Sequence, residues 1–271
     1  MPELPEVETT RRGIEPHVVD QRIVEVTVRE KRLRYPVPAR LVKELPGQAI
    51  RAVMRRGKYL LMRCDKGTVI VHLGMSGSLL VVRVTSPPAQ HDHVDIVLRN
   101  GTCLRLHDPR RFGAVLWTTR DPLRHRLLKH LGPEPLAMAF DGNYLFARSR
   151  GRQVAIKQFI MDSRIVVGVG NIYANEALFL AGIRPSHAAG RVSLTRYARL
   201  AQAIKEVLGE AINQGGTTLR DFFNSEGSPG YFRQHLCVYE RAGAPCRNCG
   251  SEIFEARLGQ RSTYYCRRCQ R

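Results

Sequence analysis

The chain has 271 residues, in which 43 Lys and Arg oppose 24 Asp and Glu, giving a formal net charge of +19. This excess of positive charge favours a polyanionic partner, because each phosphate that a basic side chain neutralises releases condensed counterions. No apolar run approaches the ~18 residues that a membrane-spanning helix needs, and no basic-then-apolar leader opens the chain. We therefore expect a soluble intracellular protein that binds nucleic acid and no membrane.

The first half of the sequence predicts one short helix followed by many strands. Residues 5–14 place Pro at the first helical position and basic residues at the end, an order that suits the helix dipole. Short β-rich runs separated by turn signals continue to about residue 120, at 23–28, 59–63, 68–73, 78–84, 94–98, 102–106 and 114–118. This pattern is typical of an antiparallel sandwich or barrel.

Helical periodicity replaces the strands after a break at residues 131–135. A glycine-rich turn from residue 168 leads into a helix over 172–180. Ser193 is placed to cap a further helix that ends at Gly215-Gly216. The stretch 217–231 mixes Gly, Ser, Pro and aromatic residues, and we expect a mobile loop there.

Four cysteines in the last quarter of the chain form two Cys-x-x-Cys pairs, separated by sixteen residues: Cys246, Cys249, Cys266 and Cys269. Each pair predicts a tight turn that directs two sulfurs to one point, and the stretch between them can fold as a hairpin. We expect one structural Zn²⁺ ion; four unrelated buried thiols are the alternative. A closed four-cysteine site does no chemistry, so the catalytic groups must lie elsewhere.

The N-terminus offers a nucleophile. Removal of Met1, which a small second residue favours, leaves the secondary amine of Pro2 at the start of the chain. Such an amine can attack an aldehydic carbon to form a cationic iminium, and it titrates about two units below a lysine amine. Glu3 beside it can act as a general acid or proton shuttle. From these residues alone, an ordinary solvated terminus stays the simpler interpretation.

Motifs along the whole chain resemble the bacterial formamidopyrimidine-DNA glycosylase family, which removes 8-oxoguanine and ring-opened purines. They are PELPEVE at 2–8, RRG at 11–13, RGKYL at 56–60, HLGMSG at 72–77, HDHVD at 91–95, DPRRFG at 108–113, GVGNIY at 168–173 and GGTTL at 215–219. The four-cysteine element completes the series. Leu4, where glycine would mark the endonuclease VIII branch, indicates the formamidopyrimidine branch.

The resemblance implies an α+β fold with two domains. We expect a catalytic N-terminal β-sandwich with flanking helices over 1–131 and a linker over 132–152. A helix–two-turn–helix DNA-binding domain would follow over 153–236, and a four-cysteine zinc β-hairpin over 237–271.

The resemblance also implies the catalytic residues. Pro2 would displace the damaged base at C1′ and form the Schiff base, and Glu3 would protonate the sugar ring oxygen. Lys58 would contact a phosphate and assist β-elimination, although a lysine at a strand end, taken alone, is more often solvated. Arg261, at the tip of the zinc hairpin, is assigned by the resemblance to δ-elimination. Phosphate binding suits it better on physical grounds, because an arginine is a poor proton donor at neutral pH.

Damage inside a duplex is reached by rotating the nucleotide out of the stack, at a cost of about a few kcal/mol. By resemblance, Met75, Arg110 and Phe112 enter the space that the nucleotide leaves. The residues implied as further DNA contacts are His91, Arg152, Lys157 and Asn171. Asn171 opens a helix, where backbone N–H groups and the helix dipole favour a phosphate.

The leading hypothesis is a bifunctional base-excision repair enzyme that excises oxidised purines from double-stranded DNA and then cleaves the strand by β,δ-elimination. We expect a monomer in the bacterial cytoplasm, associated with the nucleoid. An endonuclease VIII-like enzyme for oxidised pyrimidines and a non-catalytic zinc-ribbon DNA-binding protein are the alternatives. Catalysis requires removal of Met1, because the Pro2 nitrogen is otherwise an amide.

Overall fold

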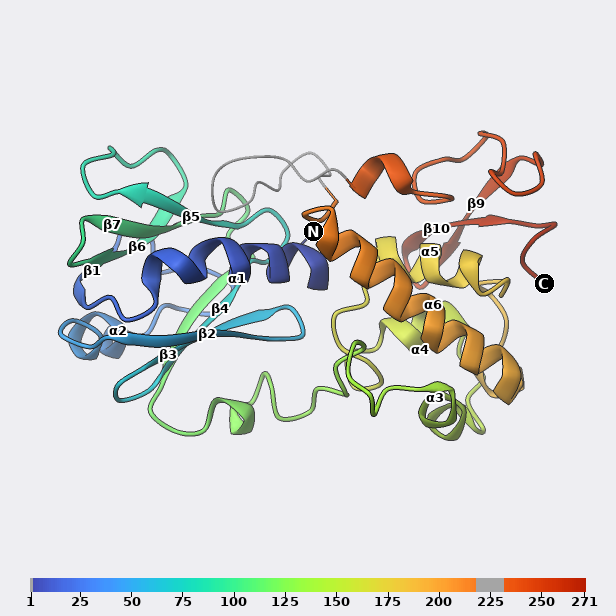
Figure 1. The fold of residues 1–271 in the computed structure, drawn as a ribbon, viewed down its shortest axis with the longest axis horizontal. Coiled ribbons are helices and arrows are strands. Elements are labelled where there is room, and N and C mark those ends of the chain that lie inside the picture. Colours follow the sequence, from blue (N-terminus) through green and yellow to red (C-terminus); the bar gives the residue numbers. More distant parts are fainter. Residues whose placement is uncertain (1, 218–231) are drawn as a thin grey trace. The chain divides into compact units, whose positions relative to one another are not determined.

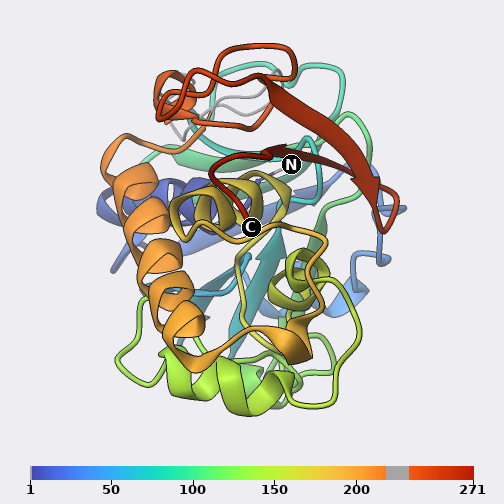
Figure 2. The same cartoon turned by 90° about the vertical axis from the view of Figure 1, so that its right-hand side faces the viewer.

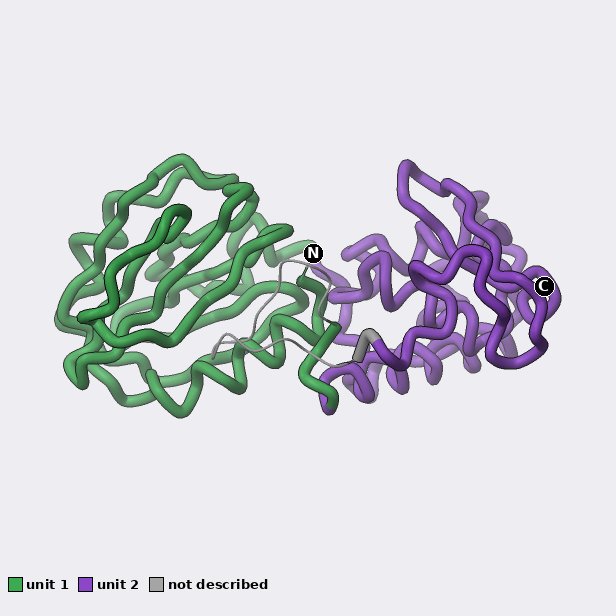
Figure 3. Tube along the Cα trace, turned by 90° about the horizontal axis from the view of Figure 1, so that it is seen from above, with its two compact units in different colours: residues 1–130, 214–231 green, residues 131–213, 232–271 purple. Residues whose placement is uncertain are grey.

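The computed structural model describes residues 2–217 and 232–271, and the chain divides into two compact units. The first unit comprises residues 1–130 and 214–231, and the second comprises 131–213 and 232–271 (Figure 3). The loop expected over 217–231 lies, beyond Thr217, outside the described residues.

Two four-stranded antiparallel sheets form the first unit, with strand orders β1-β6-β7-β5 and β2-β3-β4-β8 (Figure 1). Its elements in chain order are α1 (Leu4–Val18), β1 (Ile23–Val28), α2 (Ala39–Glu44), β2 (Ile50–Arg56), β3 (Tyr59–Cys64), β4 (Thr68–His72), β5 (Ser78–Arg83), β6 (Asp92–Leu98), β7 (Thr102–His107), β8 (Ala114–Thr118) and η1 (Pro122–Arg124). Every strand expected from the sequence is present. The sequence did not lead us to expect α2 and β2.

The two sheets share one apolar core, to which both helices contribute. Helix α1 contacts β2 and β5, which are edge strands of different sheets, and α2 contacts the two opposite edges, β1 and β8. The helices therefore cover the open sides of the sandwich, where unpaired strand edges would otherwise face solvent. Buried residues along α1, such as Val7, Ile14 and Val18, form its core face.

The second unit is helical and ends in a two-stranded hairpin, β9–β10, in which Leu258 pairs with Arg261 across the turn. Its elements are α3 (Gly142–Ser149), α4 (Ile156–Met161), α5 (Asn171–Leu180), η2 (Ala189–Arg191), α6 (Leu194–Asn213), η3 (Phe232–His235), β9 (Ile253–Leu258) and β10 (Arg261–Cys266). Helix α5 contacts α4, α6 and β10, so it is the central element of this unit (Figure 2).

The expected α+β fold, with sheets in the N-terminal part, a helical part and a C-terminal zinc hairpin, is confirmed. The range 132–152, expected as a linker, carries α3, which packs against α6. The expected domain boundaries, those of the linker included, stay predictions. Among the described residues, no helix combines the length and the hydrophobicity that crossing a membrane would require.

Candidate active site

A pair of carboxylates fixes the N-terminal segment. Glu3, only 1% exposed, caps α1 in a capping box: its side chain accepts from the Glu6 N–H, and Glu6 Oε2 accepts from the Glu3 N–H at 2.8 Å. The other Glu6 oxygen accepts from the Thr217 N–H at 2.8 Å. Pro2 is itself buried, so the residue that would carry the free amine is held in place rather than solvated.

A partly buried ion pair connects α1 to the turn that carries Lys58. Arg55 on β2 donates to Glu8 Oε2 at 2.9 Å and to the Gly57 carbonyl at 3.0 Å. Burial would raise the pKa of Glu8, but Arg55, Arg11 and Arg12 together hold it below its ordinary value. Gly57 takes φ +57 in the two-residue turn between Arg56 and Tyr59, a conformation that glycine adopts without strain. The N-terminal helix and the turn with Lys58 are thus cross-linked.

His72, at the end of β4, is kept neutral. Burial lowers its pKa from 6.5 to about 4, and the positive charges of Lys58 and Arg34 contribute. Its Nδ1 atom accepts from the Gly74 N–H at 3.0 Å, which requires an unprotonated Nδ1. The neutral ring therefore supports the turn that follows it without adding charge near Lys58.

The residues expected to enter the duplex lie on two loops of the first unit that touch each other. A Cβ atom built on Gly74, next to Met75, would lie 2.4 Å from the carbonyl carbon of Phe112. Phe112 is 42% exposed, and the Arg110 guanidinium carbon lies 5.0 Å from the centre of its ring. The structure thus brings Met75, Arg110 and Phe112 onto adjoining loops.

His91 precedes β6 and has φ +79, a conformation uncommon for a residue with a side chain. Its ring centre lies 6.2 Å from those of His93 and His107. Its carbonyl accepts from the Asp108 N–H at 3.0 Å, which joins it to the loop of Arg110 and Phe112.

In the second unit, α4 and α5 hold the hairpin next to Arg261. Lys157 Nζ and Asn171 Nδ2 both donate to the Ser262 carbonyl, at 2.7 and 3.1 Å, and Lys157 also donates to Thr263 Oγ1 at 2.7 Å. Lys157 is fully buried, so in this structure its ammonium group serves the hairpin. Its contact with a phosphate, like that of Asn171, stays a prediction. Arg261 is exposed at the first position of β10.

Arg152 lies between α3 and α4, is exposed, and donates to the Arg148 carbonyl at 3.1 Å. This bond holds the side chain against the end of α3, and the expected role of Arg152 in DNA binding stays a prediction.

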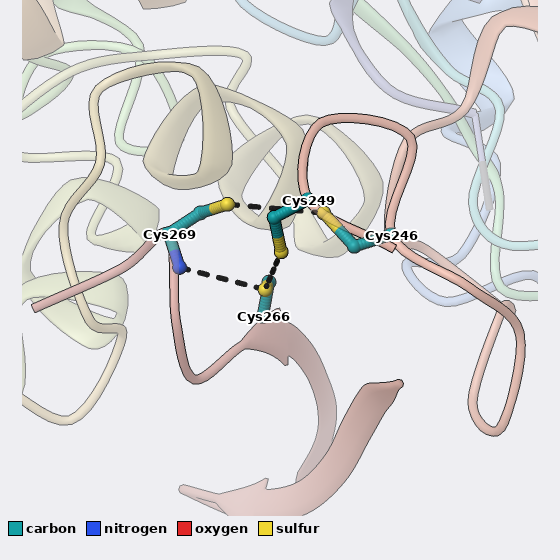
Figure 4. Close-up of side chains that lie close together, drawn as sticks. All are labelled: Cys246, Cys249, Cys266 and Cys269. Atoms are coloured by element: carbon teal, nitrogen blue, oxygen red, sulfur yellow. Dashed lines mark hydrogen bonds between the residues drawn. The ribbon is translucent and has the colours of Figure 1, made fainter. Parts of the chain in front are cut away.

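The four cysteine sulfurs converge on one point (Figure 4). All lie within 4.8 Å of one another, with 3.9 Å between Cys246 and Cys269 and 3.5 Å between Cys249 and Cys266. Zn–S bonds of about 2.3 Å in a tetrahedron place the sulfurs about 3.8 Å apart, so this geometry fits the ion. All four positions are cysteine side chains, so a zinc ion held here would have no open position for a reacting group and would be structural.

Several residues that organise the site were not singled out from the sequence. Glu6, Glu8 and Asp108 lie inside or beside the quoted motifs, but only the fold shows which loops they join. Glu176 on α5 accepts from three consecutive N–H groups, those of residues 237–239, at 2.7–3.0 Å, and burial raises its pKa. A buried acid on a helix gives no local sequence signal of such distant partners.

Family models match three successive parts of the chain. Residues 1–115 match the formamidopyrimidine-DNA glycosylase N-terminal domain, and 131–223 match the formamidopyrimidine-DNA glycosylase H2TH domain. Residues 243–271 match the zinc finger found in FPG and IleRS. The chain belongs to the formamidopyrimidine-DNA glycosylase family. Members of this family are DNA glycosylases with AP lyase activity, and the zinc finger match confirms the expected structural zinc.

Curated relatives cover the whole chain. The formamidopyrimidine-DNA glycosylase of Methylococcus capsulatus is 63% identical over 271 residues, and that of Nitrosococcus oceani is 60% identical over 270 residues. Each alignment spans 100% of both sequences.

Solved structures of family members superpose closely. The MutM (Fpg) protein of Thermus thermophilus has a TM-score of 0.89 at 37% identity, covering 99% of this chain and 98% of that one. A point mutant of Lactococcus lactis Fpg, in complex with DNA containing Fapy-dG, has a TM-score of 0.93 at 34% identity, covering 99% of each chain. The expected family is therefore confirmed at the levels of sequence and fold.

Proposed function

We propose that this protein excises oxidised purines, 8-oxoguanine and formamidopyrimidines, from double-stranded DNA and then cleaves the strand. Pro2, freed by loss of Met1, attacks C1′ of the damaged nucleotide and displaces the base. Glu3 protonates the ring oxygen as the sugar opens to the iminium. Lys58 binds a phosphate and assists β-elimination, and loss of the second phosphate completes δ-elimination.

The buried N-terminal segment is the observation that carries this proposal. A non-catalytic DNA-binding protein has no need to bury Pro2 and to hold Glu3 by a reciprocal carboxylate cap. Fixing a nucleophile before the substrate arrives removes much of the entropy cost of reaching the transition state. The Glu8–Arg55 pair extends the same restraint to the turn of Lys58.

Exposure and position support the DNA contacts that we propose for the loops of the first unit. Phe112 is an exposed aromatic ring at a loop tip, which suits a wedge between base steps, and Arg110 stacks on it with donors available for an unpaired base. We assign Met75 to the same vacated space. The residues that we propose as further contacts to the strand are His91, Arg152, Lys157, Asn171 and Arg261.

The names of the similar proteins support this substrate class. The Lactococcus lactis structures include complexes with DNA containing Fapy-dG and with DNA containing an abasic site. One more is a complex with DNA containing an oxidised pyrimidine, so binding alone does not separate the purine from the pyrimidine branch. We propose that the protein works as a monomer in the bacterial cytoplasm, at the nucleoid.

Borohydride trapping tests the proposal. Protein whose loss of Met1 is verified by intact mass is incubated with a duplex carrying 8-oxoguanine opposite cytosine, and a parallel duplex carries an oxidised pyrimidine. We expect an adduct that maps to Pro2 and forms faster on 8-oxoguanine. The matched control has one alanine added before Pro2, which turns the amine into an amide and leaves every side chain unchanged.

Each alternative gives a different result. Faster trapping on the oxidised pyrimidine places the protein with the endonuclease VIII-like enzymes. Absence of any adduct, from protein that still binds the duplexes, leaves a zinc-ribbon DNA-binding protein. Active protein that retains Met1 contradicts the Pro2 mechanism.

A further inference from the structure

Asp108 lies where three segments of the proposed DNA-contacting surface meet. It follows β7 directly, is 0% exposed, and precedes the loop of Arg110 and Phe112. A buried carboxylate is costly unless its oxygens accept hydrogen bonds, so its partners show which segments it holds.

The two carboxylate oxygens of Asp108 bind different loops. Oδ2 accepts from the Gly113 N–H at 2.7 Å, which closes the 109–113 loop. Oδ1 accepts from the hydroxyl of Ser76 at 3.1 Å, and Ser76 follows Met75 directly. The Ser76 oxygen in turn accepts from the Arg110 N–H at 3.3 Å. One hydroxyl thus donates to one loop residue and accepts from another, as its single proton and its lone pairs allow.

The backbone of Asp108 adds a third segment. Its N–H donates to the His91 carbonyl at 3.0 Å, and its own carbonyl lies 2.9 Å from His93 Nε2 and accepts from the Arg111 N–H at 3.1 Å. The start of β6 is therefore held to the same residue as the two loops.

Backbone packing reinforces this connection. Gly74 has φ +67, and a Cβ atom there would lie 2.5 Å from the Gly113 nitrogen as well as 2.4 Å from the Phe112 carbonyl carbon. The main chains of the Met75 loop and the Phe112 loop are therefore in contact. Neither loop can move closer to the other unless the other also moves.

We propose that Asp108, acting through Ser76, is a positioning residue that makes Met75, Arg110 and Phe112 enter the duplex as one rigid unit. This inference rests on the proposed function. An aspartate that only stabilised its own turn would accept from Gly113; the bond to Ser76 ties it to a loop more than thirty residues earlier. Joining the loops before binding means that the duplex does not have to order them separately, which lowers the cost of holding the nucleotide out.

The variant Ser76→Ala removes the hydrogen-bonded link between the loops and leaves their main-chain contact at Gly74 and the Asp108–Gly113 bond in place. We expect the single-turnover excision rate on duplex 8-oxoguanine to fall about tenfold, the effect of losing about 1.4 kcal/mol of coupling. Borohydride trapping on an abasic site in single-stranded DNA should change less than about twofold, because no base has to leave a stack there. The matched control is Ser78→Ala, another buried serine two positions along the chain.

Asp108→Asn and Asp108→Ala separate positioning from folding. The asparagine oxygen can accept from Gly113 while its amide donates to the Ser76 oxygen, so we expect duplex excision within about threefold of wild type. Alanine supplies neither contact, and we expect duplex excision to fall at least as far as in Ser76→Ala. A 2-aminopurine placed beside the lesion reports base unstacking, and its fluorescence change should shrink in Ser76→Ala and Asp108→Ala only.

Two results overturn the inference. Wild-type duplex excision by Ser76→Ala shows that the loops need no link. An equal loss on duplex and single-stranded substrates shows general damage to the site. Wild-type protein that traps on no lesion overturns the proposed function together with this inference, a result distinct from a defect confined to the variants.

Discussion

The two units hold their proposed DNA-contacting residues by different means. In the first, the buried carboxylates of Glu6 and Asp108 and the partly buried carboxylate of Glu8 join segments that lie over a large shared core. In the second, Arg261 stands on a hairpin whose buried apolar cluster is small and includes two of the zinc-binding cysteines. Over the large core, hydrogen bonds suffice to place a residue. The hairpin also accepts hydrogen bonds from Lys157 and Asn171, but with so small a core we expect it to need a metal ion for stability.

Loss of the zinc ion should have the largest effect, because both the hairpin fold and DNA binding depend on it. Structural zinc binding contributes about 10–16 kcal/mol to folding of small metal domains. We expect Cys266→Ala to bind no zinc, to lose more than about 100-fold in DNA affinity, and to retain the thermal unfolding transition of the sandwich. Metal analysis measures the zinc content, fluorescence anisotropy the DNA affinity, and circular dichroism the thermal unfolding transition.

The matched control for the zinc site is Cys64→Ala. Cys64 is a buried thiol of β3 whose pKa burial raises to about 12, and it should keep one zinc per chain. Normal DNA affinity in zinc-free Cys266→Ala would show that the hairpin holds Arg261 without the metal.

Breaking the Glu8–Arg55 pair tests how much the carboxylates of the first unit contribute to its stability. Arg55→Met leaves the partly buried Glu8 with Arg11 and Arg12 as its remaining partners, and we expect a loss of about 2 kcal/mol in the free energy of unfolding, as for one hydrogen bond to a charged group. Excision should slow as well, because the turn of Lys58 loses its link to α1. Arg51→Met on the same strand, where the arginine is 48% exposed, should cost less than about 1 kcal/mol in urea unfolding. Equal losses in the two variants would contradict the role of the partly buried pair.

Lowering the pH should weaken the first unit through His72. Its folded pKa of about 4 lies below the ordinary 6.5, so the unfolded chain binds the proton first as pH falls. The stability that this residue contributes is complete above pH 6.5 and declines toward pH 4, by about 2 kcal/mol between pH 7 and pH 5. In His72→Asn the amide oxygen can still accept from Gly74. Urea titrations of this variant should show a change in the free energy of unfolding between pH 7 and pH 5 that is smaller by about 2 kcal/mol than in wild type. If the stability of His72→Asn depends on pH as strongly as that of wild type, His72 is not the source of the pH dependence.

Arg261→Met should give the smallest effect. We expect DNA affinity to fall about three- to tenfold and the slope of log affinity against log salt to decrease by about one, as for loss of one phosphate contact. Arg257→Met is the control, because Arg257 is an exposed arginine on β9 that pairs in register with Ser262, beside Arg261. If both variants lose the same affinity, the hairpin contributes general charge and no fixed contact.

Local patterns predicted much of this fold, and the elements that they missed are interrupted by charged residues or too short to show a period. The cysteine spacing was sufficient for the zinc site, because each Cys-x-x-Cys turn is built from adjacent residues. Strand β2 was missed because three arginines interrupt its apolar pattern; it is an edge strand, where charges are common. Helices α2 and α3 have only six and eight residues, too few for periodicity to show.

In the candidate site, too, short motifs pointed to some residues, whereas the roles of others depend on contacts between distant parts of the chain. Pro2, Glu3 and Lys58 were predicted as catalytic residues from the resemblance of two short motifs, at 2–8 and 56–60, and stay predictions. Asp108 and Ser76 lay within quoted motifs, yet their joint role depends on a hydrogen bond between residues thirty-two positions apart. Lys157 was expected at a phosphate, and its burial beneath the hairpin depends on packing that no local pattern records.

Helix α1 has two tasks: it positions the N-terminal segment, and it covers the edges of two strands. Pro2 and its N-cap Glu3 stand directly before the first residue of this helix, which along its length covers the edges of β2 and β5. A mutation that frays the helix would release the proposed nucleophile and also uncover two strand edges, which promote aggregation. A lineage that no longer needed the repair activity would therefore still be selected to keep this helix folded, for the sake of solubility. The proposed catalytic terminus would thus be maintained by a contribution to solubility that does not involve DNA.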